Sequence, residues 1–459
     1  MLETLQKKRF HFIGIGGAGM SGLAQIMLEQ GYEVSGSDIK PSSRLTRLKT
    51  LGARVYTGHD PANLGEADVV VFSSAVPEAN VELVEARRRG LPVLSRAQLL
   101  GLLMGRRFGI AISGTHGKTT TTSLIGLILR RAGLDPTIVI GGEVDDIGSN
   151  ARLGRGPHFV AEADESDGSF LLLNPHVAVV TNIENDHLDY YQNLANIVEA
   201  FGRFVQGVNP DGAVVLCADD ANVRKILPGI RSRIITYGLT SRDADYTVRE
   251  WSLNGAGATG EVFYRGRSLG TVRLSVPGRH NLANALAVIA VGRLMGLELP
   301  AMAGPLADFR GVGRRFQLLG EVRGVRVVDD YAHHPTEIRA TLAAARTTGC
   351  RRVLCAFQPH RYTRTRLLHE EFGPAFADAD VVVISDVYGA GEPPIEGVTG
   401  ELIVRSVGRF KPDVVYLPRL EDLTSYLAAI ARPGDLIVTM GAGNIWEAGV
   451  ALVRELEAR

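Results

Sequence analysis

Short apolar runs alternate along most of the chain with segments whose apolar residues recur at helical spacing. This alternation of strand and helix patterns is typical of α/β proteins with parallel sheets. In the N-terminal part it predicts a small domain of this kind, which ends near Gly105. The strands expected there lie at 10–13, 33–36, 54–56, 69–72 and 91–94, with a helix at 20–30 after the first strand.

A second unit begins with the apolar run 108–112, which leads through a glycine-rich turn into a helical pattern. From 246 to 276 alternating residues with glycine punctuation predict an antiparallel meander. We therefore expect an α/β domain that carries an antiparallel insertion. Its other expected elements are strands at 159–161 and 177–181 and helices at 119–131 and 281–295, the latter alanine-rich and buried.

Past Gly311 the alternation of strand and helix patterns restarts, which predicts a third α/β domain. A chain of 459 residues exceeds what one hydrophobic core supports. We therefore expect three domains, at 1–106, 107–312 and 313–459. The third should contain five parallel strands, at 325–328, 352–357, 381–384, 414–417 and 436–440.

The charge balance narrows the classes of partner. The chain has 50 acidic and 50 basic residues, so it carries no broad field for gripping nucleic acid or an anionic membrane. Any anion site must therefore be local. Only seven of the basic residues are lysines, and Lys118 is the one that lies inside a glycine-rich loop.

The sequence predicts a cytoplasmic protein. Its polar, basic N-terminus, Met1 to Arg9, lacks the apolar segment of a signal peptide. No run approaches the ~20 apolar residues that a membrane span needs. An odd number of cysteines without C-x-x-C spacing favours neither a disulfide framework nor a zinc site. We expect three small buried hydrophobic residues, Cys217, Cys350 and Cys355.

A first glycine-rich loop, Gly14-Ile-Gly16-Gly-Ala-Gly19, lies between a strand and a helix, and Asp38 follows roughly 20 residues later. This context satisfies the dinucleotide fingerprint of Rossmann domains. The physics requires only that a diphosphate approach the backbone at a helix N-terminus, whether it belongs to NAD or to a UDP-sugar. The loop alone does not choose between these ligands, and glycines that serve only a tight turn would look the same.

A second glycine-rich loop, Ser113-Gly-Thr-His-Gly-Lys118-Thr-Thr120, follows a strand and opens a helix. In this context a Gly-Lys-Thr loop cradles phosphates, its lysine reaches the β- and γ-phosphate oxygens, and its threonine holds Mg²⁺. The usual pattern has a glycine where this chain has Ile112, so the loop is a shortened variant. It is the strongest single signal in the sequence.

Carboxylates follow the strand expected at 159–161, at its carboxyl end, where α/β proteins place their ligands. Such residues suit Mg²⁺, although a solvated acidic turn would look similar. The next strand ends in Asn-Ile-Glu-Asn-Asp-His-Leu-Asp, which offers Asp186 and His187, although a lone histidine is more often structural. The carboxylates after the first of these strands are Glu162, Asp164, Glu165 and Asp167.

Five elements, in the same order along the chain, resemble the Mur ligase family. They are Gly114–Thr120, the Glu162 segment, Asn182-x-x-x-Asp-His187, Arg279-His-Asn-Leu-Ala-Asn284 and Arg314-Arg-Phe316. Within the family, four further stretches resemble the member that joins L-alanine to UDP-N-acetylmuramate, which forms the first peptide bond of the peptidoglycan stem. These stretches are 14–22, 163–167, 331–335 and 357–362.

The resemblance implies an α/β fold of three domains. The N-terminal domain would be Rossmann-like and bind the UDP-sugar, the central one would be a P-loop ATPase-type domain with a β-meander, and the C-terminal one would be Rossmann-like and bind the amino acid. The first glycine-rich loop is thereby reassigned from NAD to UDP-N-acetylmuramate. The residues implied for this substrate are Gly14, Gly16, Gly17, Gly19, Met20, Ser21, Asp38, Ser73 and Ser74.

In the central domain the resemblance implies sites for ATP and Mg²⁺. Thr119 and Glu162 would hold one Mg²⁺, and His187 would hold a second near the attacking carboxylate. Arg314 would reach the γ-phosphate when the domains close, with 311–313 as a hinge. The residues implied for ATP, among which Lys118 contacts the β- and γ-phosphates, are Gly114, Thr115, His116, Gly117, Lys118, Thr119, Thr120, Asn281 and Arg314.

C-terminal elements would place the incoming amino acid. Arginine suits a fork-like grip on its carboxylate, and a histidine, a water or a phosphate oxygen would take the proton from its amine. Several relatives have a carbamylated lysine shortly after the Asp-His element, whereas no lysine lies between Lys118 and Lys225 here. That role is absent or another group fills it. The residues implied in the C-terminal domain are His334 and His360, either of which could be the base, and Arg361 and Arg364.

The expected enzyme activates a carboxylate as an acyl-phosphate with ATP and Mg²⁺ and then forms an amide with L-alanine. We expect a monomer or a weak homodimer. An NAD-dependent oxidoreductase is an alternative, but it gives Lys118 and Thr119 no role. A nucleotide sensor would not need Glu162 and His187, and a sister ligase that recycles peptides onto the same sugar nucleotide would differ in the amine that it accepts.

Overall fold

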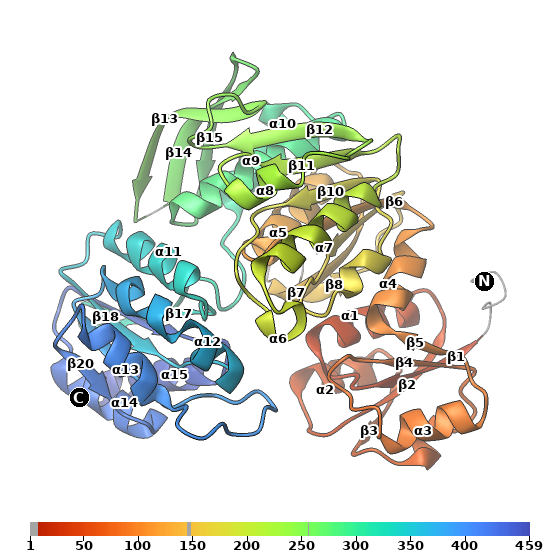
Figure 1. Cartoon of the computed structure of the whole chain (residues 1–459), viewed down its shortest axis with the longest axis horizontal. Coiled ribbons are helices and arrows are strands. Elements are labelled where there is room, and N and C mark those ends of the chain that lie inside the picture. The colour runs from red at the N-terminus through yellow and green to blue at the C-terminus, as the bar shows by residue number, and fades with distance from the viewer. Residues whose placement is uncertain (1–7, 145–147, 256) are drawn as a thin grey trace.

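The computed structural model describes residues 8–144, 148–255 and 257–459. Residues 1–7, the greater part of the N-terminal segment considered above, therefore lie outside the described residues. The chain forms three α/β units in sequence order, each around its own sheet, and the central unit contacts both of the others (Figure 1). In the described part of the chain, no helix is long and apolar enough to cross a membrane.

The N-terminal unit is a five-stranded parallel sheet of order β3-β2-β1-β4-β5. Phe10, Phe12 and Val71 are fully buried, because helices cover both faces of the sheet. The last strand begins two residues later than the apolar pattern predicted. The elements are β1 Arg9–Ile13, α1 Ala18–Glu29, β2 Glu33–Asp38, α2 Ser43–Thr50, β3 Arg54–Thr57, the 3₁₀ helix Pro61–Leu64, β4 Val69–Phe72, α3 Val81–Arg88, β5 Val93–Ser95 and α4 Arg96–Met104.

The N-terminal half of the central unit contains the glycine-rich loop between β6 and α5, as the sequence predicted. The ten-stranded sheet of this unit has the order β15-β14-β13-β12-β11-β10-β6-β9-β7-β8. The elements from β6 to β12 are β6 Phe108–Ser113, α5 Lys118–Arg131, β7 Thr137–Val144, β8 Ser149–Arg152, β9 His158–Glu162, the 3₁₀ helix Ser169–Leu172, β10 Val177–Val180, α6 Leu188–Tyr191, α7 Leu194–Gln206, β11 Ala213–Cys217, α8 Ala221–Lys225 and β12 Arg233–Gly238.

The predicted meander is confirmed as three antiparallel strands, β13 Tyr246–Asn254, β14 Gly257–Tyr264 and β15 Arg267–Leu274. It is an extension of the central sheet, because Tyr246 in β13 pairs with Tyr237 in β12. The predicted buried helix is α9, Arg279–Leu294, which packs against α5, and α10, Leu299–Asp308, follows it.

The C-terminal unit has the sheet order β16-β17-β21-β18-β19-β20, in which the five predicted strands are all parallel. The prediction missed β16, an antiparallel strand on the edge of the sheet, because none of its residues is fully buried and it forms no buried apolar run. The elements are β16 Gln317–Val322, β17 Val325–Asp330, α11 Pro335–Arg346, β18 Arg352–Phe357, α12 Tyr362–Phe372, the 3₁₀ helix Gly373–Phe376, β19 Val381–Ile384, α13 Gly400–Gly408, β20 Val414–Tyr416, α14 Leu420–Ile430, β21 Asp435–Met440 and α15 Ile445–Ala458.

The prediction for the cysteines is correct for two of the three. Cys217 and Cys355 are buried and free, whereas Cys350 is only partly buried. Cys350 lies in the loop between α11 and β18, where its thiol faces the Ala345 carbonyl at 3.6 Å. Each sheet falls within one of the three ranges proposed for the domains, and the boundaries after 106 and 312 stay predictions.

A buried carboxylate, Glu82, ties the N-terminal sheet to its surrounding loops. It is fully buried, accepts hydrogen bonds from Ser37 Oγ at 2.5 Å and Asn63 Nδ2 at 2.7 Å, and lies 3.3 Å from His11 Nε2. Burial raises the pKa of Glu82, but these polar contacts outweigh it and lower the pKa to about 2. The carboxylate form therefore stabilises this unit.

We expect Glu82→Gln to destabilise the N-terminal unit at pH 7 by about 3 kcal/mol. The pKa of Glu82 is lower in the folded protein than in the unfolded chain, so ionisation of this carboxyl group stabilises the folded state. The contribution is fully present above the ordinary glutamate pKa of 4.5 and is lost as the pH falls through about 2. Urea unfolding of both proteins at pH 7 and pH 3 measures it, and the difference should shrink at pH 3. The control is Glu85→Gln, which removes exposed ion pairs to Arg88 and Arg89 and should have a smaller effect.

Candidate active site

The first glycine-rich loop lies at the point where the N-terminal sheet reverses its strand order. In the order β3-β2-β1-β4-β5, the loops after β1 and β4 flank the switch point at the strands' carboxyl ends, where α/β sheets bind ligands in a crevice. Gly14 has a φ of +78°, and a Cβ there would lie 3.3 Å from Ser73 Cβ. Asp38 accepts the backbone N–H of Gly16 at 2.8 Å. The structure thus brings Gly14, Gly16, Asp38 and Ser73 together.

Other residues predicted for the sugar nucleotide differ in their accessibility. Gly17 and Ser74 are exposed, whereas the Met20 side chain belongs to the core. Ser21 is buried at the seam with the central unit, where its hydroxyl donates to Ala18 and accepts from Asn150 Nδ2 at 3.1 Å. Gly19 packs against Arg96, since a Cβ there would lie 3.0 Å from Arg96 Cδ. Gly17 and Ser74 therefore add to the crevice, and Met20 and Ser21 support it from beneath.

Three neighbouring strands of the central sheet, β9, β6 and β10, end at one edge and gather the polar groups predicted for nucleotide and metal. Lys118 opens α5, and its Nζ donates to Glu165 Oε1 at 2.8 Å and to the Gly114 carbonyl at 2.6 Å. His187 Nε2 lies 3.8 Å from the same Glu165 oxygen. A lysine, a carboxylate and an imidazole thus converge beside the P-loop.

Glu165 is the buried carboxylate of this group. It is 2% exposed, and its Oε2 atom is buried without a hydrogen-bond partner. Burial raises the pKa of Glu165 to about 7, although Lys118 acts in the opposite direction. For Lys118, burial lowers the pKa, but Glu165 and neighbouring carboxylates outweigh it and raise the pKa. An unpartnered carboxylate oxygen beside a neutral imidazole is a fitting place for a cation.

Glu162, the residue predicted as a metal ligand, ends β9 and accepts the Gly141 N–H at 2.9 Å. The structure thus directs Glu162 toward β7 and brings Glu165 to Lys118 and His187. Glu165 was among the four carboxylates noted after this strand, but nothing in their spacing singled it out. Its position depends on a loop held by Tyr191, whose hydroxyl donates to the Glu165 carbonyl at 2.5 Å.

A cavity of about 230 Å³ opens beside the P-loop, between the central and C-terminal units. Asn281 lies in its wall, as predicted for a residue facing the nucleotide, and its amide donates to Pro277 at 2.7 Å. Gly311 and Val312, which belong to the predicted hinge, also line it. The cavity is thus framed by both units, with P-loop residues His116, Gly117, Thr119 and Thr120 on one side and Arg315, Thr336 and Glu337 on the other.

The two adjacent arginines after the hinge have different surroundings. Arg314 binds Asp329 at 3.0 Å and donates to the carbonyls of Gly441 and Gly443 at 2.7 and 3.0 Å. Its guanidinium is therefore engaged by the C-terminal unit and does not line the cavity. Arg315 lines the cavity and lies 3.4 Å from Glu337 Oε1. In this structure Arg315 lines the cavity, and the role predicted for Arg314 in the closed arrangement of the domains stays a prediction.

The residues predicted for the amino acid form the seam between the central and C-terminal units. Arg364 contacts both carboxylate oxygens of Asp186, at 2.9 and 3.2 Å, and the pair is almost fully buried. Burial raises the pKa of Asp186, but Arg364 outweighs it and holds the pKa well below its usual range. Arg361 binds Asp189 at 2.7 Å. In this arrangement both guanidiniums join the Asp-His segment to the C-terminal unit.

The histidines predicted as proton acceptors lie in the same seam and are neutral. Burial lowers the pKa of His360 to about 3, and Arg364 donates to its Nδ1 at 3.2 Å. Burial also lowers the pKa of His334, whose Nε2 lies 3.3 Å from the Asn185 carbonyl. His333 is a residue that the sequence reasoning did not single out, and burial lowers its pKa to about 4. Its position next to His334 in the sequence was the available signal.

The fold and this site define a P-loop nucleotide-binding protein of three α/β units, in which the C-terminal unit completes the cavity beside the P-loop. Three family models match consecutive parts of the chain: "Mur ligase family, catalytic domain" at 9–108, "Mur ligase middle domain" at 112–292 and "Mur ligase, glutamate ligase domain" at 314–443. The chain belongs to the Mur ligase family, and it is therefore an enzyme, a ligase. The oxidoreductase and sensor alternatives are wrong.

Individual relatives are similar to this chain over nearly its whole length. UDP-N-acetylmuramate–L-alanine ligase of Pelotomaculum thermopropionicum is 57% identical over 98% of this chain and 98% of its own. The enzyme of the same name from Desulforamulus reducens is 49% identical, with the same coverage. Among solved structures, UDP-N-acetylmuramate-alanine ligase from Thermotoga maritima superimposes with a TM-score of 0.84, at 30% identity over 98% of this chain and 99% of the other.

A murein peptide ligase from Psychrobacter arcticus has the same architecture. It superimposes with a TM-score of 0.73 at 26% identity, over 98% of each chain. The three-domain α/β fold is thus common to ligases with different names.

Proposed function

We propose that this protein joins L-alanine to the lactyl carboxylate of UDP-N-acetylmuramate, with ATP converted to ADP and phosphate. The observation that carries the proposal is the convergence of Lys118, Glu165 and His187 at three adjacent strand ends, beside a cavity that Arg315 completes. Relatives at 49–57% identity over 98% of the chain bear the corresponding name. We further propose that the enzyme acts in the cytoplasm as a monomer or weak homodimer.

The proposed site for the sugar nucleotide is the crevice after β1 and β4. Gly14, Gly16, Gly17 and Gly19 leave the backbone accessible at the N-terminus of α1, where N–H groups and the helix dipole favour a diphosphate. Ser73 and Ser74 add hydroxyl groups from the loop across the crevice. Asp38 orders the loop through Gly16, so we assign it a supporting role.

The donor set beside the P-loop fits Mg²⁺. Glu165 offers a buried carboxylate oxygen without a partner, and His187 Nε2 lies 3.8 Å from its other oxygen. Thr119 follows Lys118, whose Nζ donates to Glu165. We propose Glu165 as a ligand alongside Thr119 and His187, with Glu162 as the alternative carboxylate. Bound ATP and Mg²⁺ would supply phosphoryl activation of a carboxylate and neutralise the charge that develops on the phosphate oxygens.

The chain's own residues would act mainly by electrostatics and position. A carboxylate repels nucleophiles, so it must be activated before an amine can attack it. Lys118, in the P-loop beside the cavity, and Arg315, in the cavity wall, would stabilise the charge on the transferred phosphoryl group. The amine of L-alanine must lose a proton, and His360, with its pKa of about 3, would be a weak acceptor in this arrangement. His334, a water or a phosphate oxygen would then take the proton.

Phosphate release by the purified protein tests the proposal. With ATP, Mg²⁺ and UDP-N-acetylmuramate, separate reactions receive L-alanine, L-serine, glycine, L-glutamate or the peptide L-alanyl-γ-D-glutamyl-meso-diaminopimelate. We expect release that requires both the sugar nucleotide and L-alanine, with the amide product identified by mass spectrometry. Release only with the peptide would instead assign the protein to the recycling ligases. If none of the acceptors gives phosphate release, both assignments are contradicted.

A further inference from the structure

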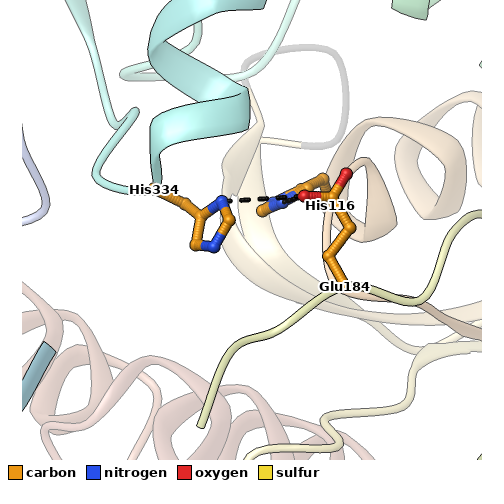
Figure 2. A group of neighbouring side chains, drawn as sticks. All are labelled: His116, Glu184 and His334. Carbon is orange, nitrogen blue, oxygen red and sulfur yellow. Dashed lines mark ion pairs between the residues drawn. The ribbon is translucent and has the colours of Figure 1, made fainter. Parts of the chain in front are cut away.

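Three side chains converge at the seam between the central and C-terminal units: His116, Glu184 and His334 (Figure 2). Each offers one nitrogen or oxygen atom, and these atoms lie within 4.8 Å of one another. Glu184 Oε2 is 3.6 Å from His116 Nε2 and 3.8 Å from His334 Nδ1. His116 belongs to the P-loop and Glu184 to the segment after β10, whereas His334 precedes α11 in the C-terminal unit.

The second nitrogen of each ring has an acceptor outside the cluster. His116 Nδ1 lies 3.2 Å from Glu337 Oε1, so an N–H there donates to that carboxylate. The lone pair of His116 then belongs to Nε2, which is buried and has no hydrogen-bond partner. His334 Nε2 lies 3.3 Å from the Asn185 carbonyl, which favours a proton on Nε2 and a lone pair on Nδ1. That lone pair now accepts the Thr336 N–H at 3.3 Å, a long hydrogen bond that a bound ion would replace.

This pattern is the one that metal-binding histidines show. Their free ring N–H almost always donates to a carboxylate or a backbone carbonyl, which fixes the tautomer and aims the other nitrogen at the ion. Here Glu337 and the Asn185 carbonyl provide both kinds of acceptor. Two neutral imidazoles and one carboxylate are a ligand set typical of zinc with an open fourth position, whereas Mg²⁺ prefers oxygen ligands alone.

We propose that His116, Glu184 and His334 form a binding site for a divalent transition-metal ion, best suited to Zn²⁺. The site is separate from the proposed Mg²⁺ ligands Glu165 and His187, and it does not depend on the identity of the ligase's substrates. Because two ligands come from the central unit and one from the C-terminal unit, a bound ion would fasten the two units together. His116 and Glu184 also line the nucleotide cavity, so the ion would hold that cavity closed.

An ion-pair network is the competing explanation of the same geometry. Burial lowers the pKa of His116, but Glu337 and Glu184 outweigh it and raise the pKa to about 9. A proton on His116 would then satisfy both carboxylates without any metal. The two explanations differ in one measurable respect: the metal site gives saturable binding of one transition-metal ion per chain, and the ion-pair network does not.

Titration of the full-length protein with Co²⁺, followed by its visible absorption and by calorimetry, separates them. We expect saturation at one ion per chain, displacement by Zn²⁺ and persistence in excess Mg²⁺. His334→Ala and Glu184→Gln should each weaken binding by at least ~100-fold, since each removes a ligand, and Glu337→Gln should weaken it by ~10-fold through the His116 orientation. Circular dichroism of each variant verifies its fold.

His360→Ala is the matched control, because His360 is a neutral imidazole of the same seam whose Nδ1 accepts from Arg364 outside the cluster. Its dissociation constant for Co²⁺ should equal that of the unmodified protein. Absence of saturable binding would overturn the proposal in favour of the ion-pair network. Binding that survives both ligand substitutions, or that is lost equally in His360→Ala, would also overturn it, because another part of the chain would then hold the ion.

Discussion

Replacement of Lys118 by alanine is expected to reduce the rate of acceptor-dependent phosphate release roughly a thousandfold. Removal of one donor that stabilises charge in the transition state typically has an effect of this size. Lys118 Nζ is held at the mouth of the P-loop by the Gly114 and Thr115 carbonyls and by Glu165. A phosphate that enters the loop meets a cation already positioned for it. The change also removes the charge that lowers the pKa of Glu165, so Glu165 would become more protonated and a poorer metal ligand.

Initial-rate measurements with saturating L-alanine and sugar nucleotide check this expectation. Lys225→Ala is the matched control, since Lys225 lies at the end of α8 in the same unit and contacts Asn222 at 2.8 Å. It should keep the full rate. A Lys118→Ala rate within tenfold of the unmodified enzyme would mean that the lysine lowers the barrier by less than about 1.4 kcal/mol. That result would remove the P-loop lysine from the mechanism.

The strands buried on both faces of a sheet were predictable almost to the residue. β4, β18 and β19 coincide with their predicted apolar runs, because parallel strands covered by helices on both sides consist of nearly continuous apolar residues. The edge strand β16 has one neighbour and no fully buried residue, so no such run marks it. The pattern of apolar residues reports burial, and it fails where only part of a strand, here Leu319 and Val322, packs against the core.

For the candidate site, the sequence identified loops reliably and individual side chains less well. The glycine-rich loops and the Asp-His segment all lie at strand ends, because parallel topology places successive loops at one edge of a sheet. Which of two neighbours faces the cavity depends on local backbone conformation. Arg314 has a φ of +60°, which the local sequence does not predict. The adjacent Arg315 is the residue that lines the cavity. Glu162 and Glu165 also have different contacts: Glu162 accepts the Gly141 N–H of β7, whereas Glu165 accepts from Lys118.

Contacts between units were the least predictable part. Arg364, expected to grip an amino acid, binds Asp186, which precedes it by 178 positions in the chain. No local pattern marks such a pair, since its partners belong to different units of the chain. The contact also has a functional implication: the arginines proposed for the substrate carboxylate are engaged by carboxylates of the protein. An incoming amino-acid carboxylate would therefore have to compete with Asp186 and Asp189 for them.

Arg315→Ala is expected to lower the rate of phosphate release by roughly a thousandfold with little change in thermal stability, because an arginine that meets the transferred phosphoryl group contributes 10³-fold or more. Arg315 lines the cavity, and its ion-pair partner there is Glu337. Its removal takes away cavity charge while the sheets remain intact. Rates at saturating ATP and melting curves of the same preparation measure the two effects separately.

For Arg314→Ala we expect the opposite result, a loss of stability with a retained rate. Arg314 pairs with Asp329, which is 1% exposed on its side chain, and donates to two backbone carbonyls. Its loss leaves a buried carboxylate without its cation, a change that costs about 3 kcal/mol or more. We expect a lower melting temperature of the C-terminal unit and a retained rate per folded molecule. The reverse outcome, in which Arg314→Ala abolishes the rate and Arg315→Ala preserves it, would return the γ-phosphate role to Arg314 and require a different closed arrangement of the two units.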